Sequence, residues 1–169
     1  RYSVASGAVG RPVEVQAYAE RIVIRQDGVV VGEHARCFGR GETIYDPWHY
    51  VPVLARKPGA LRNGAPFKDW LLPAGLEKVR RRLKGSDDGD RQMVTILSAV
   101  LTDGLPAVEA ACREALSQDV SSADVIINIL ARQRDPAGPA LTILTPDALK
   151  LRHAPVADCS RYDTLRRAS

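Results

Sequence analysis

Cysteine, aromatic residues and long apolar runs are all scarce in this sequence of 169 residues. The three cysteines, Cys37, Cys112 and Cys159, lie far apart and form no CxxC pair. An odd, dispersed set predicts neither a disulfide framework nor a zinc site, and it favours a reducing cytoplasm. No apolar run approaches the roughly 20 residues that a membrane helix needs, and no signal peptide is recognisable. We therefore expect a cytoplasmic protein with no membrane partner.

Signatures of catalysis are also missing. There is no HExxH metal motif around the histidines and no GxSxG nucleophile elbow. The glycine-containing stretch FGRGET at 38–43 lacks the GK[ST] of a phosphate-binding loop, so an ordinary turn is the better interpretation. The three histidines are His34, His49 and His153. We expect no cofactor and no enzyme active site in this chain.

An acidic cluster at Asp87, Asp88 and Asp90 could in principle hold paired metal ions. It stands immediately before a predicted helix, however, where carboxylates are favoured by the positive end of the helix dipole. A helix start explains the cluster better than a metal site does.

Negative charge is absent from one whole segment, because no carboxylate occurs between Pro47 and Lys68. Six cations in and before this segment are opposed only by Glu42 and Asp46, and they are Arg36, Arg40, Arg56, Lys57, Arg62 and Lys68. The whole chain has a net charge of +4 and a pI near 9.2, which permits nucleic-acid binding. Unopposed cations suit a phosphate backbone. The alternative is a structural joint, in which the nearby aromatic residues hold the segment to the rest of the fold rather than stack on bases.

A second basic element, KVRRRLK at 78–84, places five positive charges in seven residues. Such a run is often a solvated helix face, with Val79 and Leu83 turned to the core. The functional alternative is a helix that contacts phosphates, whose binding would weaken steeply with salt.

The N-terminal part has the patterns of β-strands. Pro12–Tyr18 alternates apolar Val13, Val15 and Ala17 with polar residues, as a half-buried strand does. Runs at 21–26 and 29–36 flank Asp27-Gly28, a strong signal for a hairpin with a type I′ turn. With a short strand at 1–4, these elements predict a small curled antiparallel sheet or barrel of SH3-like size.

The C-terminal part changes to helical periodicity. Asp46-Pro47 has the form of a helix cap followed by proline, Pro52 should interrupt or restart that helix, and 57–66 is expected to be non-helical. Apolar residues then recur at helical spacing in four segments, at 72–83, 88–103, 105–118 and from Ser121 or Ser122 to 134. The wide apolar faces at 93–101 and 125–130 could bind a partner or could form an internal core.

These patterns predict an α+β protein with a small SH3-like antiparallel β-barrel at 1–45, a basic connecting segment at 46–71 and an α-helical bundle at 72–134. A linker and short helices follow at 135–169. The residues that we predict to contact nucleic acid are Arg36, Arg40, His49, Arg56, Lys57, Arg62, Lys68, Arg80, Arg81 and Lys84.

One long motif carries a family resemblance. The stretch FGRGETIYDPWHYVPVLARKPGALRNGAPF at 38–67 resembles the C-terminal region of IstA-type insertion-sequence transposases, which work with an AAA+ helper ATPase of the IstB type. The pattern DxxHYxxxLxxKPGAL begins here at Asp46 and ends at Leu61. The stretches at 90–112, 122–134 and 155–167 are similar to the tail of the same family.

This resemblance implies a function and its partners. Transposases of this type carry an RNase H-like core with a DDE triad, and no triad residue maps onto this chain, so we expect a non-catalytic module. The β part is similar to the barrel that follows the catalytic core of Mu-type transposases. The resemblance implies contact with double-stranded transposon-end DNA, other transposase protomers and the helper ATPase, in the bacterial cytoplasm at the nucleoid. The alternative is a protein-interaction module that docks the ATPase or a second protomer.

Overall fold

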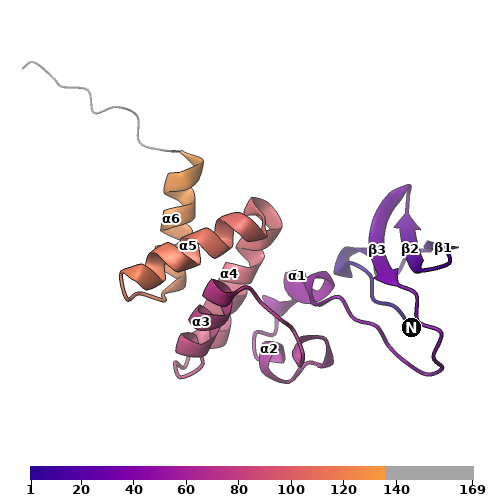
Figure 1. The fold of residues 1–169 in the computed structure, drawn as a ribbon, viewed down its shortest axis with the longest axis horizontal. Coiled ribbons are helices and arrows are strands. Elements are labelled where there is room, and N and C mark those ends of the chain that lie inside the picture. The colour runs from indigo at the N-terminus through magenta and orange to yellow at the C-terminus, as the bar shows by residue number, and fades with distance from the viewer. Residues whose placement is uncertain (136–169) are drawn as a thin grey trace, which may run out of the picture. The chain divides into compact units, whose positions relative to one another are not determined.

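The computed structural model of this protein describes residues 1–135. These residues form three strands, six α-helices and three short 3-10 helices (Figure 1). The strands are β1 (Glu14–Ala17), β2 (Arg21–Gln26) and β3 (Val29–Ala35). The α-helices are α1 (Val51–Leu54), α2 (Ala60–Asn63), α3 (Ala74–Leu83), α4 (Gly89–Asp103), α5 (Leu105–Ser117) and α6 (Ala123–Arg134). The 3-10 helices are η1 (Ser6–Ala8), η2 (Pro47–Tyr50) and η3 (Ala65–Phe67). The linker and short helices predicted at 135–169 lie almost wholly outside the described residues, as do His153 and Cys159.

The strands form an antiparallel sheet in the order β1-β2-β3 (Figure 1). The central strand is rich in β-branched residues, and its Ile22 pairs with Ala17 of β1 and with His34 of β3. Asp27 and Gly28 connect β2 to β3 with φ angles of +51° and +79°. Both angles are positive, as a type I′ turn requires. The hairpin predicted from the Asp-Gly pair is therefore confirmed.

The predicted closure of this sheet into an SH3-like barrel is not found in residues 1–135, where the sheet has three strands and stays open. The predicted strand at 1–4 makes a single isolated bridge, between Tyr2 and Ile44. Ala5 donates a backbone hydrogen bond to Val31 on the β3 side, so this segment does not reach the free edge of β1. The burial predicted for β1 is also wrong, because all four of its residues are exposed. An alternating pattern identifies a strand but does not specify what covers it.

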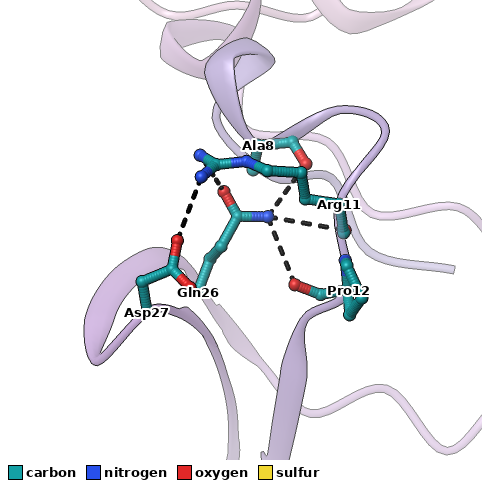
Figure 2. Close-up of polar contacts among 5 residues, drawn as sticks. All are labelled: Ala8, Arg11, Pro12, Gln26 and Asp27. Atoms are coloured by element: carbon teal, nitrogen blue, oxygen red, sulfur yellow. Dashed lines mark hydrogen bonds and ion pairs between the residues drawn. The ribbon is translucent and has the colours of Figure 1, made fainter.

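A buried glutamine ties the loop before β1 to the hairpin (Figure 2). The Gln26 side chain is 6% exposed, and its Nε2 donates to the carbonyl oxygens of Ala8, Arg11 and Pro12 at 3.1, 3.4 and 3.3 Å. Its Oε1 accepts from Arg11 Nη2 at 2.8 Å, and the same guanidinium pairs with Asp27. Three carbonyl groups of the loop thus find a donor inside the fold, which fixes the path of the chain into the sheet.

The connecting segment is more helical than predicted. The Asp46 carboxylate accepts the backbone N–H of Trp48, so the predicted cap is confirmed, and helix α1 restarts around Pro52. The stretch at 57–66, predicted to be non-helical, contains α2. Leu61 at 3% exposure explains this turn, because its burial in the core stabilises a helix too short to persist by propensity alone.

Helices α3 to α6 form the main core, and their predicted extents agree with the structure to within about two residues. Pro73 has extended backbone angles, so α3 begins at Ala74 rather than at Leu72. The buried side chains are those of the predicted apolar faces, and they include Leu76, Val79, Met93, Ile96, Leu97, Val108, Cys112, Ile126, Ile129 and Leu130. Burial of each large side chain contributes about 1.5–3 kcal/mol. In residues 1–135 no helix is long and apolar enough to span a membrane.

Candidate nucleic-acid interface

One cation of the connecting segment and three cations of the basic run at 78–84 line one groove in the fold. The groove has a volume of about 480 Å³ and lies between α2, α3 and the first turn of α4. Its charged and polar lining consists of Arg62, Asn63, Glu77, Arg80, Arg81, Lys84 and Asp90. We call the four cations among them, Arg62, Arg80, Arg81 and Lys84, the groove cations.

Buried neighbours on the same helices orient the groove cations. In α3, Val79 and Leu83 are buried in the core. Helical geometry then turns the residues that follow each of them, Arg80 and Lys84, away from the core. In α2, the buried Leu61 has the same effect on Arg62. Only part of the basic run at 78–84 therefore faces the groove. Its Arg82 does not line the groove and pairs with Asp119 at 2.8 Å.

Two carboxylates partly neutralise the groove cations. Arg62 Nε lies 2.7 Å from Asp90 Oδ2. Glu77 pairs with Arg81 at 3.1 Å and with Arg80 at 3.8 Å. Four cations against two carboxylates leave an excess of two positive charges, and Lys84 has no ion-pair partner within residues 1–135. Exposed ion pairs contribute only about 0–1 kcal/mol each, so a phosphate can replace the carboxylates at little cost.

The other predicted cations of the connecting segment do not line the groove. Arg56, Lys57 and Lys68 are all exposed. Arg56 lines a different hollow of about 640 Å³, together with Trp48, Val53 and other residues. The structure therefore divides the predicted basic segment between at least two surfaces.

Arg36 and Arg40 are exposed residues that follow β3. The Arg36 guanidinium lies 4.8 Å from the centre of the Phe38 ring and donates to the carbonyl oxygen of Tyr18 at 2.8 Å. Neither arginine lines the groove.

His49 lies mostly inside the fold, and it lines the same hollow as Arg56. Its side chain is 13% exposed, and its Nδ1 lies 2.9 Å from the Ser3 hydroxyl. Burial lowers the pKa of His49, and the nearby His34 adds to the lowering, although Asp46 raises it. The ring is therefore biased toward its neutral form, which suits a structural contact better than a phosphate contact.

The aromatic residues of the connecting segment pack against each other in edge-to-face and tilted contacts. The Trp48 and Trp70 rings lie 4.8 Å apart, and Phe67 lies 5.6 Å from Trp70 and 6.4 Å from Tyr50. Phe67 is buried and the other three pack against the core. The structure thus favours the anchoring interpretation of these rings over base stacking.

The acidic cluster at 87–90 is engaged in local structure. Asp88 accepts hydrogen bonds from Ser86 and Gln92, and Asp90 pairs with Arg62. Within residues 1–135 no group of three His, Cys, Asp or Glu side chains is placed to hold a metal ion.

Sequence reasoning missed the two carboxylates of the groove and its Asn63. Glu77 could have been found, because it stands four residues before Arg81 on one helix face. Asp90 gave no such signal, since it is 28 residues from Arg62.

The chain is similar to known transposases. Residues 1–46 match the family model described as the Mu transposase, C-terminal domain. The chain is 42% identical to a transposase from Aminobacter aminovorans, and 40% identical to the transposase for insertion sequences IS1326/IS1353 from Pseudomonas aeruginosa and from Shigella flexneri. Each match covers 99% of this chain, which spans about a third (34%) of the length of each relative. No solved structure matches the chain.

The predicted resemblance to insertion-sequence transposases is therefore confirmed, whereas none of these relatives is named as the IstA type or as a partner of an ATPase. Over nearly its whole length the chain is similar to insertion-sequence transposases, and its first 46 residues match the C-terminal domain of the Mu transposase.

Proposed function

We propose that this chain is a non-catalytic, DNA-contacting module of an insertion-sequence transposase, of the IstA type, and that it helps to assemble the complex on transposon-end DNA. The observation that carries the proposal is the convergence of Arg62, Arg80, Arg81 and Lys84 on one groove. The similarity to transposases adds independent support.

The chemistry of the groove suits duplex DNA read through its phosphates. Guanidinium groups form bidentate hydrogen bonds with phosphate oxygens, and they are held on short helices that are fixed by buried leucines. The groove also contains the first turn of α4, whose positive dipole end favours an anion. Such contacts position a protein on DNA but carry little sequence information. Arg36, Arg40, Arg56, Lys57 and Lys68 remain proposed contacts outside the groove. The His49 side chain is only 13% exposed and gives little support to a direct contact.

The test is a salt titration of binding to a labelled transposon-end duplex. The triple variant Arg62→Ala, Arg81→Ala and Lys84→Ala should bind more weakly, and the slope of log affinity against log salt should become shallower by about 0.9 for each lost phosphate contact. The loss should be similar on an unrelated duplex, because phosphates are the ligands.

A matched control removes the same charge elsewhere. Arg25, Arg91 and Arg132 do not line the groove, so replacing these three with alanine should leave the salt slope near that of the unchanged chain. Equal losses in both triple variants would show that net charge matters and the groove does not. Failure of the chain to bind the duplex even at low salt would reject the proposal.

An alternative function is docking of the AAA+ helper ATPase or a second transposase protomer. The apolar faces of α4 and α6 give it little support, because most of their large side chains are buried in the core. A specific observation in its favour is the hollow beside α1, where Val53 and Leu101 are 41% and 52% exposed. Docking there should respond weakly to salt and should be lost in a Leu101→Glu variant, measured by co-purification with the ATPase or by sedimentation.

A further inference from the structure

Two exposed aromatic rings beside the sheet are paired with guanidinium groups rather than with other rings. Residues 1–135 contain eight Phe, Trp and Tyr residues, and six of them pack against another aromatic or histidine ring. The remaining two are Tyr18, which lies 5.0 Å from the Arg21 guanidinium, and Phe38, which lies 4.8 Å from that of Arg36. We call these four residues the aromatic platform.

One direct hydrogen bond joins the two pairs. Arg36 Nη1 donates to the Tyr18 carbonyl at 2.8 Å, so its guanidinium contacts both aromatic residues of the platform. The turn from Tyr18 to Arg21 is closed by a backbone hydrogen bond of 2.9 Å, and Arg36 N–H donates to the Glu20 carbonyl at 2.8 Å. The backbone before Phe38 is also fixed, because Cys37 N–H donates to the Tyr2 hydroxyl at 2.7 Å. The platform is therefore built on positioned backbone.

Both rings of the platform are open to solvent. Phe38 is 77% exposed and Tyr18 is 45% exposed, in a chain that is short of aromatic residues. The guanidinium of Arg36 packs on the Phe38 ring, and most of the ring surface remains open to solvent. An aromatic ring paired with an arginine and open to solvent is the arrangement on which single-stranded nucleic acids stack their bases.

We propose that the aromatic platform binds single-stranded nucleic acid, with unpaired bases on the Phe38 and Tyr18 rings and a backbone phosphate on Arg36. A base inside a duplex has both faces covered by its neighbours, so it cannot stack on these rings. The platform and the groove thus take different forms of nucleic acid.

The charges around the platform make stacking its main source of affinity. Arg21 is paired with Glu33 at 3.5 Å, and Glu42 accepts a hydrogen bond from Cys37 Sγ at 3.0 Å. Arg36 has no ion-pair partner within residues 1–135. With carboxylates nearby, few phosphates can be neutralised, so binding at the platform should depend less on salt than binding at the groove does.

The experiment measures the binding of the full 169-residue chain to a labelled 15-nucleotide oligothymidylate and to a labelled duplex of arbitrary sequence. Phe38→Ala and Phe38→Leu should each weaken binding of the oligothymidylate by at least about five-fold and leave duplex binding unchanged. Phe38→Trp should retain or strengthen binding of the oligothymidylate. The leucine variant keeps apolar surface but removes the aromatic face, so it separates base stacking from a general apolar contact with the oligonucleotide.

Val9→Ala is the matched control, because Val9 is also 77% exposed and lies outside the platform. It should bind both nucleic acids as the unchanged chain does. Oligothymidylate binding that survives in Phe38→Leu, or that is lost in the groove triple variant but not in Phe38→Ala, would overturn the proposal. Duplex binding in the same experiment depends on the groove cations and the other proposed phosphate contacts but not on the two rings, so failure of one proposal is distinguishable from failure of the other.

Discussion

The imidazole Nδ1 of His49 lies 2.9 Å from the hydroxyl of Ser3, a residue 46 positions earlier in the chain. The same hydroxyl accepts the backbone N–H of Asp46 at 2.8 Å, and the Ser3 carbonyl accepts from His34 Nε2 at 2.7 Å. Ser3, His49 and Asp46 have the residue types of a hydrolytic triad. The Ser3 hydroxyl is buried and already has a donor and an acceptor, however, so the cluster joins the N-terminal segment to the connecting segment instead.

This cluster should make stability depend on pH. The pKa of His49 is lowered below its ordinary value of 6.5, first by burial. Above pH 6.5 the ring is neutral in both states, and its full contribution to the free energy of unfolding is present. As the pH falls from 6.5 to the lowered pKa, His49 takes up a proton in the unfolded chain before it does so in the folded chain, and this contribution is lost. The melting temperature of the chain should decrease between pH 7.5 and pH 5.

A His49→Asn variant is the control for this pH dependence. Its amide oxygen can accept from the Ser3 hydroxyl but does not titrate, so the decrease in melting temperature should become smaller. An identical decrease in the variant and in the unchanged chain would assign it to other groups.

The hairpin turn should be sensitive to substitution at Gly28. Gly28 has a φ angle of +79°, and an added Cβ would meet nothing within 4 Å, so any cost comes from the backbone and not from a clash. Valine resists positive φ, and Gly28→Val should lower the free energy of unfolding by about 1–3 kcal/mol in urea denaturation. Gly28→Asn should cost clearly less, because asparagine tolerates this conformation. Equal losses in the two variants would contradict the strain argument.

The start of α3 depends on a carboxylate from α5. Glu109 accepts the backbone N–H groups of Gly75 and Leu76 at 2.9 and 3.0 Å and pairs with Arg113 at 2.8 Å. Glu109→Ala would leave these donors without a partner and should lower the free energy of unfolding by about 1–3 kcal/mol. Glu114 is also in α5 and makes an exposed pair with Arg132 of α6, so Glu114→Ala should change the free energy of unfolding by less than about 0.5 kcal/mol.

The Glu109 contact also has a pH signature. Burial raises the pKa of Glu109, but the two N–H donors and Arg113 outweigh it and the pKa is lowered below 4.5. Its stabilisation is therefore present above pH 4.5 and is lost as the pH falls through the lowered pKa. The Glu109→Gln variant should therefore lose less stability than the unchanged chain as the pH falls below 4.5. An acid-unfolding transition identical to that of the unchanged chain would show that Glu109 does not contribute to it.

The helical part was predictable from sequence, and the sheet only in part. The stripes around Leu76, Met93 and Ile126 specify both a helix and its buried face, because helical periodicity and core packing agree there. The Asp27-Gly28 turn was also predictable, because it depends on two adjacent residues. Closure of a barrel was not predictable, because it depends on whether residues 1–5 pair with β1 or with β3. Nothing in the sequence pattern of either strand decides between these two edges.

The candidate sites were also predictable only where they depend on residues that are close together in the sequence. Clusters of cations along the chain were visible, but their meeting in one groove depends on contacts such as Arg62 with Asp90, across 28 residues. The platform was not predicted, because Tyr18 and Phe38 are isolated from each other in the sequence. Residue type alone also does not tell whether an aromatic side chain is exposed or buried.

The groove carboxylates provide the most direct test of how the groove works. Glu77 competes with phosphate for Arg80 and Arg81, so Glu77→Gln should free both guanidinium groups and tighten duplex binding by about two- to five-fold at low salt. The gain should fade as salt screens the charges. Glu114→Gln, which frees Arg132 outside the groove, provides the control. A larger gain with Glu114→Gln than with Glu77→Gln would place the DNA on another face, because relief of a counter-charge strengthens binding only where the freed cation meets phosphate.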